Sequence, residues 1–119
     1  MKPPTKPYKF HPACLAFPLL AHAELRELAD DIKLRGLLNP IVVFHGQILD
    51  GRNRLAACEI ASVAPRFIEW SGSGSPVEWV IATNLHRRHL SASQRAVVAL
   101  DLLPLLEKEA KERQRRRRW

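Results

Sequence analysis

Apolar side chains recur at helical spacing between Glu24 and Arg35. Acidic residues come early in this stretch and basic residues come late, which is the order that a helix dipole favours. We therefore expect a helix over 24–35, closed by Gly36 as a left-handed C-terminal cap. Spacings of three and four residues place its apolar positions on one face: Leu25, Leu28, Ala29 and Ile32.

Short apolar runs after this helix indicate β-strands. Residues 41–44 are all apolar, and they are followed by His45-Gly46, a plausible tight turn, and by a second run over 47–49. These two runs predict a β-hairpin. The alternation of residues over 66–70 predicts a third strand.

Capping signals mark three further helices. Asp50 is expected to cap a helix over 51–61, with apolar contacts from Leu55, Ala56, Ala57 and Ile60. Residues 75–78 form a capping box with proline at the first helical position. A second box, over 91–94, opens a long C-terminal helix through Val97, Leu100 and Leu103, in which Pro104 should cause a kink or a split.

The predicted order is arm, helix, hairpin, helix, strand, helix, helix. It indicates an α+β fold with a small mixed sheet and a C-terminal helical segment, and not a doubly wound sheet. No apolar run approaches the roughly 18 residues that a membrane helix needs, so no membrane partner is expected. The two cysteines, Cys14 and Cys58, lack metal-type spacing. A reduced, cytoplasmic location is the default for such a chain.

The net charge of +7 is concentrated at the C-terminal end, where residues 107–119 hold seven basic and three acidic side chains. A basic tail binds polyanions by counterion release, without sequence preference. The alternative is a solvated helix end whose arginines stabilise the helix dipole. The residues that we expect to contact DNA are Arg88, Arg95, Arg113, Arg115, Arg116, Arg117 and Arg118.

The first candidate site is the stretch Gly51-Arg52-Asn53-Arg54, between a predicted strand and a predicted helix. Glycine allows a ligand to approach the backbone closely, and the first turn of a helix exposes N–H groups that bind anions. Arg54 adds bidentate contacts to phosphate oxygens. Taken alone, the glycine–arginine pattern is a weak signal for a ligand, and a capped helix with two solvated arginines is the favoured interpretation.

The second candidate site lies before the second capping box, over residues 84–89, and its candidate ligands are Asn84 and Arg87. Asn84 follows two apolar helix positions by three and four residues, so it lies on or beside the buried face and needs hydrogen-bond partners. One interpretation is an asparagine that closes the end of its helix. The other is that Asn84 and Arg87 close over a triphosphate, with Asn84 near a metal ion.

Together, these segments resemble the N-terminal, nuclease-like domain of the ParB family, which has the ParB/sulfiredoxin fold. Three sequence motifs of the family occur here in the same order, and the first of them is similar to residues 28–32 and 36–43. The second is similar to residues 51–57, where the family has G-E-R-R-x-x-A. The third is similar to residues 83–87 with Leu90 and Ala96 behind, where the family has E-N-x-x-R-x-x-L. The resemblance covers about residues 10–100.

The resemblance implies a partition or regulatory module that binds CTP or another nucleotide, with Mg²⁺, and that works beside DNA and self-associates. It divides the chain into an arm (1–9), a ParB-like nucleotide-binding domain (10–90) and a helical extension with a basic tail (91–119). Thr83 stands where the family has a glutamate, which removes a carboxylate ligand that Mg²⁺ prefers. Hydrolysis is therefore expected to be weak or absent.

Two other functions stay open. One is a small enzyme on the same fold, either a nucleotide-dependent kinase or a nuclease. A sulfiredoxin is disfavoured because Asn53 stands where its reactive cysteine would precede the arginine, and Cys58 is expected to be a small buried residue. The other is an interaction domain that keeps only a vestigial pocket.

Overall fold

The computed structural model describes residues 8–87 and 90–117. The chain divides into two compact units, Met1–Ser71 and Gly72–Trp119. The described part of the first unit contains β1 (Lys9–Phe10), α1 (Pro12–Leu15), α2 (His22–Arg35), β2 (Ile41–Phe44), β3 (Gln47–Asp50), α3 (Arg52–Ala61) and β4 (Phe67–Glu69). The second contains α4 (Pro76–Arg87) and α5 (Ala92–Arg117).

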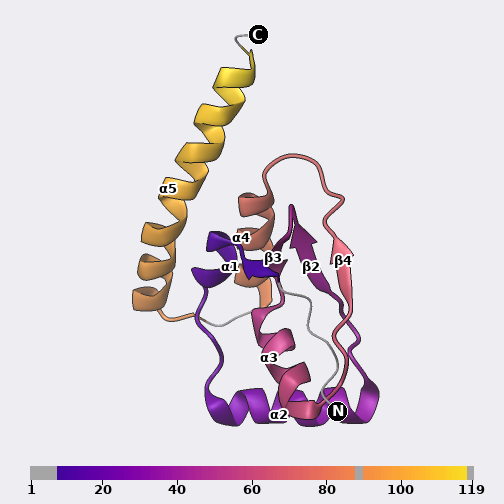
Figure 1. The fold of residues 1–119 in the computed structure, drawn as a ribbon. Coiled ribbons are helices and arrows are strands. Elements are labelled where there is room, and N and C mark those ends of the chain that lie inside the picture. The colour runs from indigo at the N-terminus through magenta and orange to yellow at the C-terminus, as the bar shows by residue number, and fades with distance from the viewer. Residues whose placement is uncertain (1–7, 88–89, 118–119) are drawn as a thin grey trace. The chain divides into compact units, whose positions relative to one another are not determined.

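The sheet of the first unit has the strand order β1-β3-β2-β4 (Figure 1). The two outer pairs, β1 with β3 and β2 with β4, are parallel, whereas β2 and β3 are antiparallel. The antiparallel pair is the predicted hairpin. Its two-residue loop has positive φ at both positions, 49° at His45 and 77° at Gly46, as a turn that matches the twist of the strands requires.

Helix α3 packs between two groups of buried side chains in the first unit. Toward α2, its Ala57 and Cys58 join a cluster that includes Ala29 and Ile32. Toward the sheet, Leu55 packs against a second cluster, made of Cys14, Ile41, Val43 and Ile48. The predicted contact at Ile60 is wrong, because this side chain is exposed while Cys58 takes the inward position.

A serine side chain caps the helix at both predicted capping boxes of the second unit. The Ser75 hydroxyl accepts a hydrogen bond from the Glu78 amide, 3.0 Å away. At the start of α5, Ser91 and Gln94 exchange two bonds: the Gln94 amide donates to the Ser91 hydroxyl, and the Ser91 amide donates to the Gln94 side chain. Ser75 also bonds Glu109, which ties the start of α4 to α5.

Helix α5 differs from its prediction in two ways. It continues through Pro104, so the expected split is wrong. Its buried residues are Val98 and Leu102, whereas the apolar residues from which the helix was predicted are exposed: Val97, Leu100 and Leu103. An apolar stripe is therefore left on the outer face of the helix.

The fold class is confirmed at the level of a small α+β protein with a mixed sheet and a C-terminal helix. Strand β1 and helix α1 were not predicted, because two paired residues and a single helical turn are too short to produce a periodic pattern. Helix α2 ends at Gly36 with φ 82° but ψ 174°, so the predicted left-handed cap is instead an extended conformation that is essentially restricted to glycine. Among the described residues, no helix is both long and apolar enough to cross a membrane.

Replacing Pro104 tests the backbone of α5. Proline removes one helical hydrogen bond, so Pro104→Ala should stabilise the helix by up to about 3 kcal/mol. Thermal unfolding followed by circular dichroism should show a higher midpoint. Leu103→Ala is the control, because this neighbour is also exposed and its replacement leaves the backbone bonds unchanged. An equal midpoint for Pro104→Ala and the native chain would contradict the expectation.

Candidate phosphate-binding site

The junction between β3 and α3 is built around Gly51. The strand ends at Asp50, and Gly51 occupies the N-cap position of α3 with φ 118°. The prediction that Asp50 is the cap is therefore wrong by one residue. No side chain caps the helix from the Gly51 position, so this helix start keeps the character of an anion site.

Close packing explains why this position is glycine. A side chain at Gly51 would begin 3.0 Å from Ile41 Cγ1 and 3.2 Å from Arg54 Nη2. Its positive φ is also unfavourable for any residue with a β-carbon. The chain's own atoms thus fill the space in which the side chain would begin, and this glycine has a structural reason independent of any ligand.

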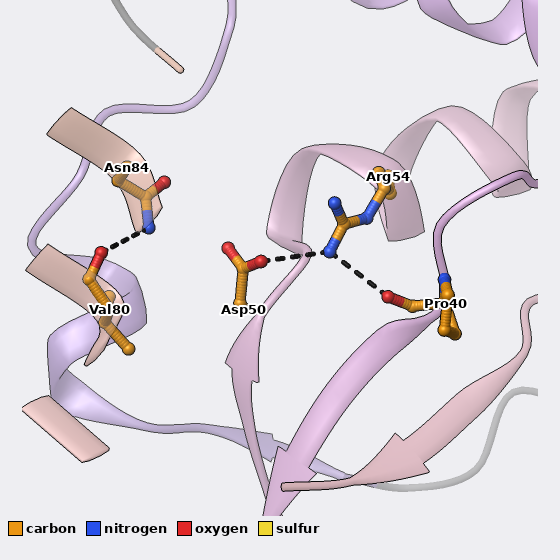
Figure 2. Close-up of polar contacts among 5 residues, drawn as sticks. All are labelled: Pro40, Asp50, Arg54, Val80 and Asn84. Carbon is orange, nitrogen blue, oxygen red and sulfur yellow. Dashed lines mark hydrogen bonds and ion pairs between the residues drawn. The ribbon is translucent and has the colours of Figure 1, made fainter. Parts of the chain in front are cut away.

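Arg54 folds back over the junction, and only 15% of its side chain is exposed (Figure 2). Its Nη2 donates to Asp50 Oδ2 at 3.1 Å and to the Pro40 carbonyl at 3.2 Å. Its Nε is buried and has no hydrogen-bond partner. The guanidinium therefore joins the end of β3 to the start of β2 while one buried donor stays unsatisfied.

The two residues between Gly51 and Arg54 hold the segment that connects α1 to α2. The Asn53 side-chain oxygen accepts a hydrogen bond from the Leu20 amide at 2.9 Å, and Asn53 is buried. Arg52 Nη1 donates to the Phe17 carbonyl at 3.4 Å. Both predicted nucleotide ligands thus make structural contacts with the preceding part of the chain.

The second predicted group lies on α4. Thr83 is half-buried and Asn84 is buried, which confirms that Asn84 lies on the inner face. Its Nδ2 donates to the Val80 carbonyl one turn earlier, at 2.9 Å (Figure 2). Arg87 is the last residue of α4, and its side chain lies outside the described part. Helix α4 belongs to the second unit, whereas Gly51 and Arg54 belong to the first.

The predicted DNA-contacting arginines lie on α5. Arg95 is exposed in its first turn, and the basic cluster forms the last turns of the helix rather than a loose tail. The exposed arginines of this cluster are Arg113, Arg115, Arg116 and Arg117. Arg88 and Arg118 lie outside the described residues.

Neither a reactive thiol nor a metal centre is found in the described part of the chain. Cys58 is fully buried, as predicted, and burial raises the pKa of its thiol, with a smaller lowering by Arg54 and a small rise from Glu59. No three His, Cys, Asp or Glu side chains among residues 8–87 and 90–117 gather into a group that could hold a metal.

No protein-family model, no curated protein and no solved structure matches this chain.

The Asp50–Arg54 pair was the part of this site that the sequence interpretation missed. The i, i+4 spacing of an acid and an arginine was its available signal, but Asp50 was assigned to the cap. Because the side chains of the pair are only 9% and 15% exposed, each charge depends on the other for the solvation that it has lost.

Neutralising Asp50 should therefore destabilise the chain strongly. We expect Asp50→Asn to cost about 3 kcal/mol, because it leaves the Arg54 charge buried without its partner. The matched control is Asp31→Asn, which breaks the Asp31–Arg35 pair of the same spacing but with side chains 46% and 65% exposed. That change should cost less than about 1 kcal/mol. Urea unfolding measures both free energies, and equal losses would show that the buried pair has no special role.

Proposed function

We propose that this chain is a ParB-like regulatory module that binds the phosphates of a nucleotide at the start of α3 and associates with DNA through the basic end of α5. The observation that carries the proposal is the helix start at Gly51, which Arg54 covers. The resemblance of three sequence motifs to the ParB family suggests that the ligand is a nucleotide, with CTP as the first candidate.

The geometry of the junction supports an anion ligand. Gly51 leaves the first turn of α3 without a side-chain cap of its own, and the positive end of the helix dipole lies there. Arg54 Nε is a buried donor without a partner, a state that costs about 1–3 kcal/mol. A phosphate bound at the helix start would give the guanidinium an anionic partner after a small rotation away from Pro40.

A regulatory role fits this chain better than catalysis. Thr83 replaces the family's glutamate, and the described residues lack a carboxylate cluster for Mg²⁺. In the proposal, Thr83, Asn84 and Arg87 contribute to the phosphate side of the site, as the resemblance implies. Binding without efficient hydrolysis would make the nucleotide an effector rather than a substrate.

The contacts of Arg52 and Asn53 favour a second candidate, an interaction domain in which the pocket is vestigial. Both side chains are used to hold the segment before α2. In that case α3 would keep its glycine and arginine for packing alone. A failure to bind any nucleoside triphosphate separates this candidate from the first.

Calorimetry on the native chain and on Arg54→Lys tests the phosphate site. Lysine keeps the charge beside Asp50 but loses the planar fork that binds two oxygens. We expect the native chain to bind CTP or ATP, and the variant to bind about tenfold more weakly or worse. Arg66→Lys is the control, because Arg66 belongs to the same unit and donates to the carbonyls of Leu37 and Leu38.

Circular dichroism of both arginine variants must show the native helix content, so that weaker binding is not a result of unfolding. An unchanged nucleotide affinity of Arg54→Lys would show that the phosphates do not bind at the start of α3. No binding by the native chain would favour the interaction domain.

Deleting residues 113–119 tests the contact with DNA. The exposed arginines of this segment can neutralise several phosphates, so affinity should fall with salt at a log–log slope of about −0.9 per phosphate. The deletion should flatten this slope, and two unrelated duplexes should bind equally well because contacts to phosphates carry no sequence information. Fluorescence anisotropy across a salt series is the measurement. A preference for one duplex, or an unchanged slope, would place the DNA contact elsewhere.

A further inference from the structure

The last turn of α5 is exposed on every side. Successive residues of a helix point about 100° apart, so five consecutive residues cover its whole circumference. Residues 113–117 are all helical and all exposed. No face of this helix end is therefore buried in the described part of the chain, in contrast to the positions of Val98 and Leu102 nearer the start of the helix.

Six basic side chains of this helix end form two ridges on nearly opposite sides of the helix. Spacings of three and four residues align the members of the first, called the lysine ridge: Lys108, Lys111 and Arg115. The second, called the arginine ridge, lies about 160° away around the helix axis: Arg113, Arg116 and Arg117. All six side chains are exposed, and none of them forms an ion pair with another residue among 8–87 and 90–117.

The two acidic residues that alternate with these bases along the chain are withdrawn from the surface. Glu109 bonds Ser75 at the start of α4, and Glu112 is half-buried. The next acid back, Glu107, is exposed but precedes both ridges. The exposed charges of residues 108–117, about 15 Å of helix, are therefore cationic and complementary to phosphates.

A helix with cationic ridges on opposite sides fits between two walls of phosphate. An α-helix with its side chains is about 10–12 Å across, and the major groove of B-form DNA is about 12 Å wide, with one strand on each side. The minor groove, about 6 Å wide, is too narrow for a helix. The major groove of A-form RNA is deep and narrow. B-form DNA is thus the duplex whose groove admits this helix end.

We propose that the end of α5 enters the major groove of B-form duplex DNA, with the lysine ridge on the phosphates of one strand and the arginine ridge on those of the other. The inference rests on the DNA contact proposed above and adds the form of the nucleic acid and the groove. Both ridges contact phosphates, which carry no sequence information. A helix end lying on the outside of a duplex would use only one ridge, because the other would point away from the DNA.

Neutralising each ridge separately tests whether both contact phosphates. The variants are Lys108→Gln/Lys111→Gln and Arg113→Gln/Arg116→Gln, and glutamine is a good helix former, which circular dichroism checks. Fluorescence anisotropy with a labelled duplex across a salt series should show that each variant reduces the log–log slope by about 1.8. The control, Arg26→Gln/Lys33→Gln, makes the same change of net charge at exposed positions of α2 and should keep the native slope. A slope that changes in only one ridge variant, or equally in the control, would overturn the proposal.

Blocking the groove tests where the helix lies. A duplex whose cytosines carry a glucosylated 5-hydroxymethyl group keeps its sequence and phosphates but fills the major groove with a neutral sugar. The native chain should bind this duplex, and an RNA duplex of the same sequence, at least about tenfold more weakly than unmodified DNA, because only one ridge then reaches phosphates. A duplex with 5-methylcytosine, whose groove stays open, is the matched control and should bind like unmodified DNA.

The two proposals fail in different ways. Equal affinity for blocked and unmodified DNA, or for RNA and DNA duplexes, would overturn the groove and leave the DNA contact of the proposed function standing. A native chain that binds no duplex at low salt would contradict that DNA contact, and this inference with it.

Discussion

The contact on which the sheet–helix junction depends is the buried ion pair between Asp50 and Arg54. Its geometry requires three features at once: a strand that ends in a carboxylate, a glycine with positive φ, and an arginine one turn into the helix. The Pro40 carbonyl adds a third group to the same guanidinium. A charge that has lost most of its water is tolerated only with such partners, so the pair fixes how α3 leaves the sheet.

The first turn of α3 also holds the chain that precedes α2. Asn53 accepts from Leu20, and Arg52 donates to Phe17. Arg52 and Asn53, which the sequence predicts as phosphate ligands, are thus also residues that hold the first unit together. An anion at this helix start would have to share Arg54 with Asp50, and such competition links ligand affinity to the stability of the junction. This link is a physical reason for a small module to respond to a ligand rather than merely to hold it.

Helix α5 separates its tasks by face. Val98 and Leu102 are buried, while Ser75 and Glu109 tie the helix to the start of α4. The opposite face keeps an exposed stripe that changes from apolar to basic, and the last turns carry further exposed arginines outside that stripe. A helix of 26 residues has enough length for these roles, because positions that differ by one or two residues point in different directions.

The sequence by itself determined the elements that depend on local chemistry. Three kinds of feature need only neighbouring residues, so their patterns could be recognised directly from the sequence. They are the buried apolar face of α2, the hairpin turn at His45 and Gly46, and the capping positions Ser75 and Ser91. The glycine–arginine candidate site was found in the same way. Its nucleotide and DNA partners remain predictions, because they depend on ligands rather than on local pattern.

Only the tertiary structure decided where the polar groups of those elements go. Asp50, predicted as a helix cap, pairs with Arg54 instead, because Gly51 occupies the cap position. Asn53 makes a structural contact because Leu20, 33 residues earlier, lies beside it. Strand β1 exists because β3 offers it a pairing edge, and Val97 and Leu100 are exposed because Val98 and Leu102 face inward instead. Each outcome depends on residues distant in sequence, and a local pattern contains no information about which distant group will supply the partner.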